Sequence, residues 1–396
     1  MYFDPPNPAQ LMDSFDEELP QQAFQDLTKC PVHRPEGIKV LAKRDDIVHF
    51  TRHPAVRATN GHNFTMGAKE PLIPLDLDGD EQRIFRRLLD PLFSPRAVER
   101  IRPDVRKLTD ELIDDFIAAG QTDLFGSFCQ PLPSRIFMDL LGLPQEDMEK
   151  FLAFKDAVIR PEGSTLEEQE IFKQHAGDEM TEYLHSVFDA REMSGVLDDD
   201  LIGGLLSAEV DGRKLTRSEI TRIVYLLVIA GLDTVAASLS CILAWFAKHP
   251  RERAEVIADP SLLPAAIEEL MRFESPVHMG HRHVTEDFEL NGWSFKAGEL
   301  VEVAWASANV DPDVFENPLH VDLARKRNAH IGFASGPHRC LGSNLARMEL
   351  VTVIERFHRR IPEYAISPGQ KPMYVNYGVR LAAYLPISFP EGEKVS

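Results

Sequence analysis

The sequence predicts a mainly α-helical fold with small β-sheets, in which one long central helix crosses a single domain. Residues 98–190 repeatedly show helical periodicity, interrupted only at glycines and prolines. The most apolar helix runs from 217 to 248, and about thirty residues at 1.5 Å each give a rod of roughly 45–50 Å. Polar and apolar residues alternate within 282–305 and around 374–385, which is typical of strands.

The composition predicts a soluble cytoplasmic protein. Hydrophobic residues make up 43% of the 396 residues, enough for one core over 1–396 behind a loosely ordered arm at 1–30. The formal net charge of −20 argues against nucleic acid and anionic membranes as partners. The N-terminus has no basic and apolar signal region. The scattered cysteines, without a CxxC pair, are typical of a reducing compartment: Cys30, Cys129, Cys241 and Cys340.

The N-terminal third is predicted to hold a strand, two helices and one long irregular segment. Residues 38–42 alternate like a strand, and 45–52 form a short helix that stops before Pro54. Residues 55–80 show little periodicity, which in a compact protein favours a lid or binding loop over a linker. A basic helix follows at 80–89.

The long apolar helix opens with a capping box, Thr216-Arg-Ser-Glu219, and stops before Pro250. Apolar residues surround it on all sides, so it is either a core helix or a membrane span. Asp233 at its middle would be costly in lipid. We therefore predict the core helix of a soluble protein.

The C-terminal part combines helices with short strands. A helix at 264–274 is followed by the strands of 282–305, with a turn at Asn291-Gly292. Residues 345–360 form an amphipathic helix, and the last strands lie around 374–385.

The loop Phe333-Ala-Ser-Gly-Pro-His-Arg-Cys-Leu-Gly342 is the most specific motif of the chain. Cys340 lies just before a helix, where unpaired N–H groups and the helix dipole favour a thiolate. The glycines at 336 and 342 let the backbone approach a large flat ligand. A haem iron held by a thiolate needs this arrangement, because N–H···S bonds tune the electron donation that favours O–O cleavage. The alternative is a buried structural cysteine in a glycine-rich turn.

The spacing F-x-x-G-x-H-x-C-x-G resembles the haem-binding loop of the cytochrome P450 family. The likeness extends from residue 80 to the C-terminal strands, and it points to the soluble bacterial class, similar to the camphor-hydroxylase type. It implies the cytochrome P450 fold and haem b, with Cys340 as the iron ligand. Ala334 and Gln82 depart from the family pattern, which has glycine and more often histidine there. The cofactor-binding residues that it implies are Gln82, Arg86, Ala230, Gly231, Arg282, Phe333, Gly336, His338, Cys340 and Gly342.

Haem propionates need cations or other donors, and three segments offer them. These are Gln82 with Arg86 in the basic helix, Arg282 at the start of the strands, and His338 beside the cysteine. Each arginine could instead be a solvated surface charge.

The stretch Ala230-Gly231-Leu232-Asp233-Thr234 lies in the middle of the long helix. Glycine there costs about 1 kcal/mol relative to alanine, which indicates a purpose. Thr234 can bond a backbone carbonyl and open the turn beside a ligand. The resemblance to the family's [AG]-G-x-[DE]-T motif implies that Asp233 and Thr234 deliver protons to iron-bound dioxygen. The alternative is a helix kink with a satisfied polar pair.

Glu269 and Arg272 are three residues apart on one helix face and can form an ion pair. E-x-x-R is weak by itself, but here it precedes the cysteine loop in the family's order. The resemblance adds Arg325 as a third member, and it assigns all three to supporting the loop.

The resemblance implies a monooxygenase that inserts one atom of dioxygen into an apolar C–H bond. Its electrons would come from a [2Fe-2S] ferredoxin with an NAD(P)H-dependent reductase. A haem-thiolate sensor or carrier remains an alternative, although it has no need of a proton relay; a peroxide-driven haem enzyme is another. The predicted pocket is apolar, which favours a small apolar substrate: Leu226, Ile229, Ala230, Val277, Met279 and Val379. The predicted ferredoxin surface comprises Arg83, Arg86, Arg87, Arg339 and Arg347.

Overall fold

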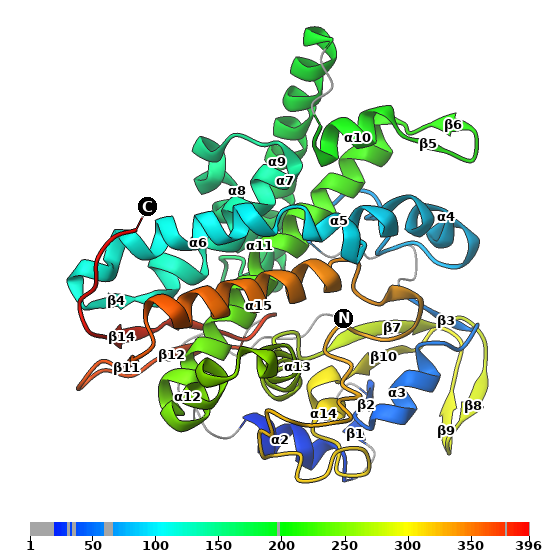
Figure 1. Ribbon diagram of the computed structural model, residues 1–396. Helices are drawn as coiled ribbons and strands as arrows, with labels where there is room; N and C mark the ends of the chain where they lie inside the picture. Colours follow the sequence, from blue (N-terminus) through cyan, green and yellow to red (C-terminus); the bar gives the residue numbers. More distant parts are fainter. Residues whose placement is uncertain are drawn as a thin grey trace. The chain divides into compact units, whose positions relative to one another are not determined.

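A computed structural model describes residues 20–29, 32–33, 37–58, 66–195, 199–376 and 378–395 (Figure 1). The chain divides into two compact units. The first contains Ala58–Ser94 and Pro133–Asp233; the second contains Pro95–Leu132, the chain from Thr234 onward and the described residues before Ala58. Most of the predicted arm at 1–30, and residues 59–65 of the predicted lid, lie outside the described residues. The single domain expected over 1–396 stays a prediction.

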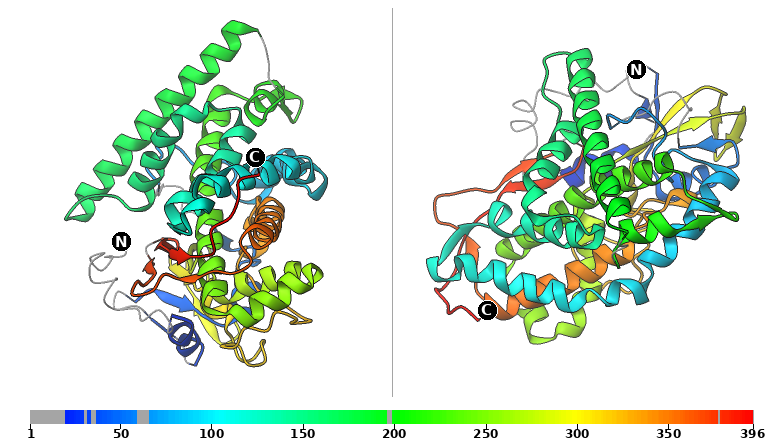
Figure 2. Two further views of the ribbon diagram at one scale, coloured as in Figure 1. Left: turned by 60° about the vertical axis from the view of Figure 1, so that its left-hand side comes forward. Right: turned by 90° about the horizontal axis from the view of Figure 1, so that it is seen from above.

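The first unit is helical apart from one short hairpin. The longest helix that lies wholly in this unit is α9 (Leu166–Ser194). It starts at a capping box in which Glu168 N donates to Thr165 Oγ1 over 3.2 Å. Figure 2 shows α9 as an unbroken rod. The other elements are α4 (Gly79–Leu89), the 3-10 turns Asp90–Phe93 and Gln145–Asp147, α7 (Pro131–Leu141), α8 (Met148–Ile159), α10 (Leu201–Ser207), β5 (Glu209–Val210), β6 (Arg213–Lys214) and the first half of α11 (Arg217–Lys248).

Helix α11 begins as the sequence predicts. Glu219 N donates to Thr216 Oγ1 over 3.2 Å, and Thr216 N donates to the Glu219 carboxylate over 2.7 Å. Among the described helices, only α11 has the length and composition of a membrane span, and 78% of its most apolar window is buried by protein. This burial is what a core helix requires.

Two glycines bring separate segments of the first unit into backbone contact. Gly67 has a φ of +70°, and a Cβ there would lie 2.2 Å from the Lys173 carbonyl oxygen. A Cβ on Gly177 of α9 would lie 2.2 Å from the Gly67 carbonyl oxygen. The Tyr225 hydroxyl donates to Met66 O over 2.7 Å and fixes the same contact to α11.

The second unit contains the main sheet, in the order β1 (Val32–His33), β2 (Lys39–Leu41), β10 (Leu300–Val303), β7 (Gly280–Val284) and β3 (Val56–Arg57). Only β2 and β10 run parallel, with Val301 opposite Lys39. The hairpin of β8 (Phe288–Leu290) and β9 (Trp293–Phe295) turns at Asn291 and Gly292, whose φ angles of 50° and 82° confirm the predicted tight turn. Helix α3 (Arg44–Phe50) packs its apolar face on this sheet.

The helix that follows the Cys340 segment packs against another helix of the second unit. Helices α6 (Arg102–Phe116) and α15 (Ser343–Arg360) lie side by side in Figures 1 and 2, and Arg356 bonds Asp110 across them over 2.7 Å. The remaining elements are α2 (Pro20–Leu27), α5 (Pro95–Glu99), the 3-10 turns Ile117–Ala119, Pro260–Leu262 and Gly336–His338, the π-helix Phe125–Cys129, α12 (Pro250–Ala258), α13 (Leu263–Glu274), α14 (Trp305–Asn309), β4 (Gln121–Asp123), β11 (Ala365–Ile366), β12 (Met373–Val375), β13 (Leu381–Tyr384) and β14 (Pro386–Ser388).

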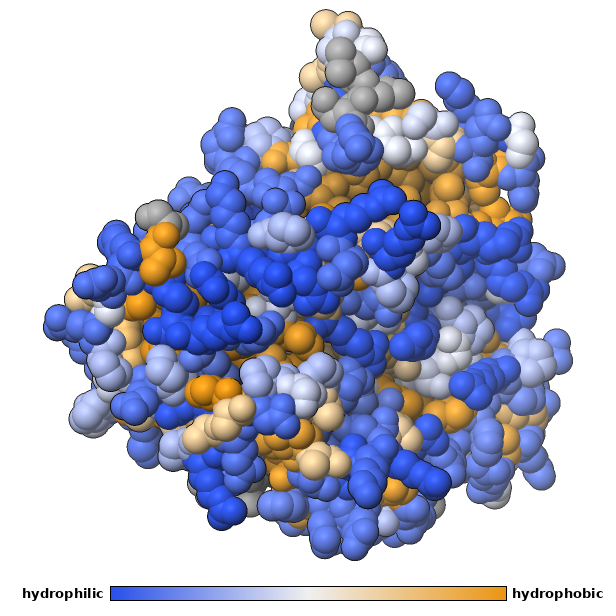
Figure 3. All heavy atoms as spheres, viewed as in Figure 1, coloured by the Kyte–Doolittle hydropathy of each residue, from blue (hydrophilic) through white to orange (hydrophobic). Residues whose placement is uncertain are grey.

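The predicted fold class, mainly helical with small sheets and one long helix, is confirmed. Hydrophilic residues cover most of the face that Figure 3 presents, in keeping with the net charge of −20.

Candidate functional site

The cysteine loop, residues 331–342, is closed by its own backbone. Cys340 N donates to Phe333 O and Ala334 N donates to Ile331 O, each over 2.9 Å. A 3-10 turn spans Gly336–His338, and α15 begins at Ser343, three residues after the cysteine. Cys340 therefore lies two residues before the N-cap, Gly342, at the positive end of an eighteen-residue helix, as the sequence predicts.

Three residues shape this loop. Gly336 has a φ of +75°, and a Cβ there would lie 2.6 Å from the Thr51 carbonyl oxygen. A Cβ on Gly342 would point into open space, so a flat ligand can approach the backbone there. Ala334 adopts a left-handed backbone conformation, with a φ of +59°. A left-handed conformation at a residue with a Cβ is strained by about 1 kcal/mol, which is the local cost of alanine at this position.

The thiols differ sharply in their surroundings. Cys129 and Cys241 are buried, and burial raises the pKa of both, that of Cys241 to about 12. Cys340 is exposed. Among the three described cysteines, Cys340 is thus the exposed one, and its surroundings differ from those of a buried structural cysteine.

Glu269 and Arg272 form the ion pair that their spacing predicts. Both side chains are fully buried, and two N–H groups of Arg272 reach the Glu269 oxygens over 2.8 Å. Arg325 Nε adds a third bond of 2.9 Å, and Asn328 a fourth of 3.1 Å. The cluster ties α13 to the chain segment that leads into the cysteine loop.

The Asp233 carboxylate is held by two cations within the first unit. It is 1% exposed, and it accepts from Arg160 over 2.8 Å and from Lys155 over 3.2 Å. Sequence reasoning missed both partners. The sequence does hold a signal for Lys155, because this lysine falls on the apolar face of α8 between Phe151 and Val158. In the structure it is only 2% exposed.

Gly231 has a packing role that the sequence did not predict. A Cβ there would lie 2.6 Å from the Phe137 ring of α7, so glycine lets the two helices approach. Next to this contact on α11, Leu226, Ala230 and Thr234 follow at intervals of four and are not fully buried, in a helix whose other residues mostly are. An open stripe on a core helix fits a flat cofactor or an apolar substrate.

The predicted pocket residues fall in both units. Leu226, Ile229 and Ala230 lie on α11 in the first unit. In the second unit, Val379 belongs to a buried cluster with Ala237, one helical turn after Thr234, and Val277 packs against that cluster. Met279 is half-buried.

The residues predicted to contact the haem propionates also fall in both units. Gln82 and Arg86 lie on α4 in the first unit, where Gln82 is buried and Arg86 bonds Asp90 over 2.8 Å. Arg282 and His338 lie in the second unit, and the Arg282 guanidinium is 5.8 Å from the Trp305 ring centre.

The arginines of the predicted ferredoxin surface differ in their exposure. Arg87 and Arg339 are exposed, and Arg83 is 64% exposed beside Asp80. Arg347 is instead only 29% exposed and forms an ion pair with Glu268.

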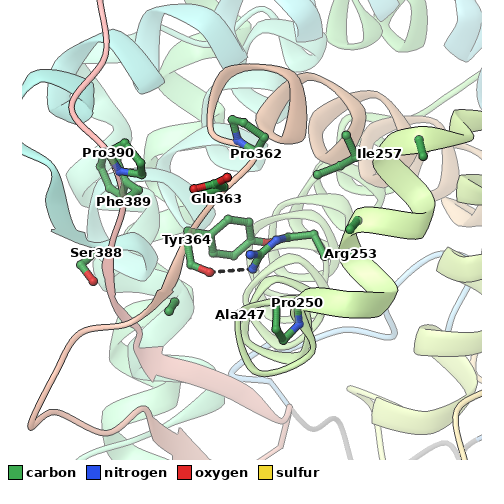
Figure 4. Close-up of a pocket in the computed structure, with 13 residues that line it drawn as sticks. Ala247, Pro250, Arg253, Ile257, Pro362, Glu363, Tyr364, Ser388, Phe389 and Pro390 are labelled. Carbon is green, nitrogen blue, oxygen red and sulfur yellow. Dashed lines mark hydrogen bonds between the residues drawn. The ribbon is translucent and has the colours of Figure 1, made fainter.

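A groove of about 690 Å³ lies elsewhere in the second unit, between α12 and the C-terminal strands (Figure 4). Arg253 bonds Tyr364 O over 2.6 Å and stacks on the Tyr364 ring at 4.2 Å. None of the predicted substrate residues line this groove. Its arginine, Arg253, already bonds the backbone at Tyr364.

Comparisons with known proteins agree on one family. A sequence model of the family Cytochrome P450 matches residues 147–363. The chain is 31% identical to the polyketide biosynthesis cytochrome P450 PksS of Bacillus subtilis over 360 residues, 90% of this chain and 82% of that protein. It is 32% identical to the cytochrome P450 monooxygenase PikC of Streptomyces venezuelae over 383 residues, 92% and 89% of the two chains. The structure of CYP109E1 from Bacillus megaterium with testosterone has a TM-score of 0.86 at 26% identity, covering 97% and 100%.

Proposed function

This chain belongs to the cytochrome P450 family of monooxygenases, and from that premise we propose that it hydroxylates a small apolar compound with dioxygen. Its electrons would come from a [2Fe-2S] ferredoxin and its NAD(P)H-dependent reductase. The names of relatives support an apolar substrate, since they refer to polyketide biosynthesis and to a methyl-branched lipid. We further propose that the two units work as one domain in the cytoplasm.

The family carries haem b with a thiolate ligand. The observation that carries our assignment is the exposed Cys340 thiol, next to the N-terminus of α15, in a loop closed by the Phe333 carbonyl. Arg282 and His338, with Arg86 and Gln82, would bind the propionates. The open backbone at Gly342 fits this group. Haem supplies the activation of dioxygen when bound.

Asp233 and Thr234 would supply protons in the reaction. The Asp233 carboxylate is buried, and Arg160 links it to Asp156, whose side chain is 51% exposed. This chain of charged groups leads from solvent to the residue next to Thr234. Arg83, Arg87 and Arg339 would offer an acidic ferredoxin a local positive field on a chain whose net charge is −20.

Replacing the proposed ligand tests the assignment. Cys340→His should keep some haem but lose the thiolate signature in the spectrum of the reduced carbon-monoxide complex. Cys241→Ser is the control and should leave that spectrum unchanged, because this thiol is buried. Survival of the signature in Cys340→His would show that another residue binds the iron. Screening apolar compounds for a change in the haem absorption spectrum then identifies the substrate class.

A further inference from the structure

A second ion-pair cluster lies beside the cysteine loop in the second unit. Arg347 of α15 donates two hydrogen bonds to the carboxylate of Glu268 on α13, over 2.5 and 2.8 Å. His330 Nε2 lies 2.9 Å from the same carboxylate. We call Glu268, His330 and Arg347 the loop clamp.

The loop clamp contacts the cysteine loop at its first residues. His330 directly precedes the loop, and its Nδ1 accepts from Gly332 N over 3.2 Å. The ring proton must therefore lie on Nε2, where it is donated to Glu268. The Arg347 guanidinium lies 4.3 Å from the centre of the Phe333 ring. Phe333 in turn accepts the Cys340 N–H, so contacts run without a break from Glu268 to the cysteine.

The clamp is partly shielded from solvent and charged. The His330 side chain is 3% exposed, and those of Glu268 and Arg347 are 28% and 29% exposed. Burial opposes ionisation of Glu268, but the bonds from His330 and Arg347 outweigh it and lower the pKa of Glu268 to about 2. A bidentate arginine–carboxylate pair is among the stronger polar contacts, and it fixes orientation as well as distance.

Adjacent residues of α13 hold the two sides of the loop region. Glu269 binds Arg325 and Asn328, which precede the loop, while Glu268 binds His330 and Arg347, which flank it. The E-x-x-R pair is therefore not the sole attachment of this segment to α13, since Glu268 adds a second one.

We propose that the loop clamp positions the Cys340 loop for iron ligation, and that Arg347 serves this purpose rather than ferredoxin docking. The proposal rests on Cys340 as the ligand. Arg347 holds the Phe333 ring by a cation–π contact, and Glu268 holds Arg347. Arg347 is only 29% exposed and its charge is compensated by a carboxylate that is itself 28% exposed, which leaves little accessible field to attract an acidic partner, whereas the side chain of Arg83 is 64% exposed.

The test compares two glutamine variants on the same helix in the haem-loaded protein. Arg347→Gln breaks the clamp; Arg356→Gln breaks the pair with Asp110, at a similar exposure of 33% and away from the loop. Both are reduced chemically, without ferredoxin, and the thiolate signature of the carbon-monoxide complex is followed over time. We expect Arg347→Gln to lose the signature about tenfold faster than wild type. Arg356→Gln should resemble wild type, and Arg347→Lys should lie between.

Two results would overturn the inference. One is an equal loss in Arg356→Gln, which would show a general weakening of α15. The other is a stable signature in Arg347→Gln. A salt-dependent loss of ferredoxin-driven reduction in the same variant would then restore the docking role. If Cys340→His loses the signature while Arg347→Gln keeps it, only this inference fails. If Cys340→His keeps the signature, another residue binds the iron, and the assignment of Cys340 as the ligand fails together with this inference.

Discussion

Glu349 of α15 should make the stability of this protein depend on pH. Its side chain is 2% exposed, and its Oε2 receives no hydrogen bond from any described residue. Burial raises the pKa of this carboxyl from 4.5 to about 8. The folded chain therefore binds the proton more tightly than the unfolded chain does. The resulting stabilisation is complete below pH 4.5 and is lost as the pH rises through 8.

The size of the effect follows from the two pKa values. Between pH 6 and pH 8, wild type should lose about 2 kcal/mol of unfolding free energy relative to Glu349→Gln, which has no proton to lose. Equilibrium urea unfolding of both haem-loaded proteins at the two pH values measures this difference. Glu111→Gln, at a side chain that is 43% exposed on α6, is the control and should follow wild type. A difference between wild type and Glu349→Gln that stays constant with pH would refute the reasoning.

The remaining predictions concern protons and electrons. In Thr234→Ala, electrons should still be consumed, but more should appear as hydrogen peroxide and less as product; unchanged peroxide per reductant would remove Thr234 from the relay. Asp233→Asn should slow turnover, because the amide that replaces the carboxylate held by Lys155 and Arg160 can neither take up nor release a proton; a wild-type rate would contradict this. Arg83→Glu should reduce ferredoxin-driven turnover at low salt while substrate binding is unchanged. The difference in turnover between Arg83→Glu and wild type should shrink as the Debye length falls from about 10 Å at 0.1 M to about 3 Å at 1 M salt. A difference that does not depend on salt would place docking elsewhere.

Features fixed by neighbours in sequence were predictable from the chain alone. The capping box of α11, the Asn291-Gly292 turn and the Glu269–Arg272 pair each depend on residues at most three apart. The parallel pairing of β2 with β10 joins Lys39 to Val301, and no local pattern indicates it. Contacts between residues close in sequence could thus be predicted from the sequence, whereas contacts between residues far apart in sequence required the structure.

The same limit applies to the candidate site. The cysteine loop is dense in residues with distinct chemistry, so its motif stands out from one stretch of sequence. The partners of its neighbours do not stand out: Glu268 and Arg347 are 79 residues apart, and Asp233 and Lys155 are 78 apart. A charge read from sequence alone was therefore assigned to solvent or to a partner when the fold had already paired it, as with Arg347.

The backbone contact between Gly67 and Gly177 sets a limit on directed evolution of this enzyme. Any side chain at position 177 would meet the Gly67 carbonyl at 2.2 Å, and any at 67 would meet that of Lys173. Both obstacles are main chain, so no rotamer change can relieve them. Saturation libraries of the first unit should therefore recover only glycine at both sites, and the diversity that alters substrate range must come from other positions.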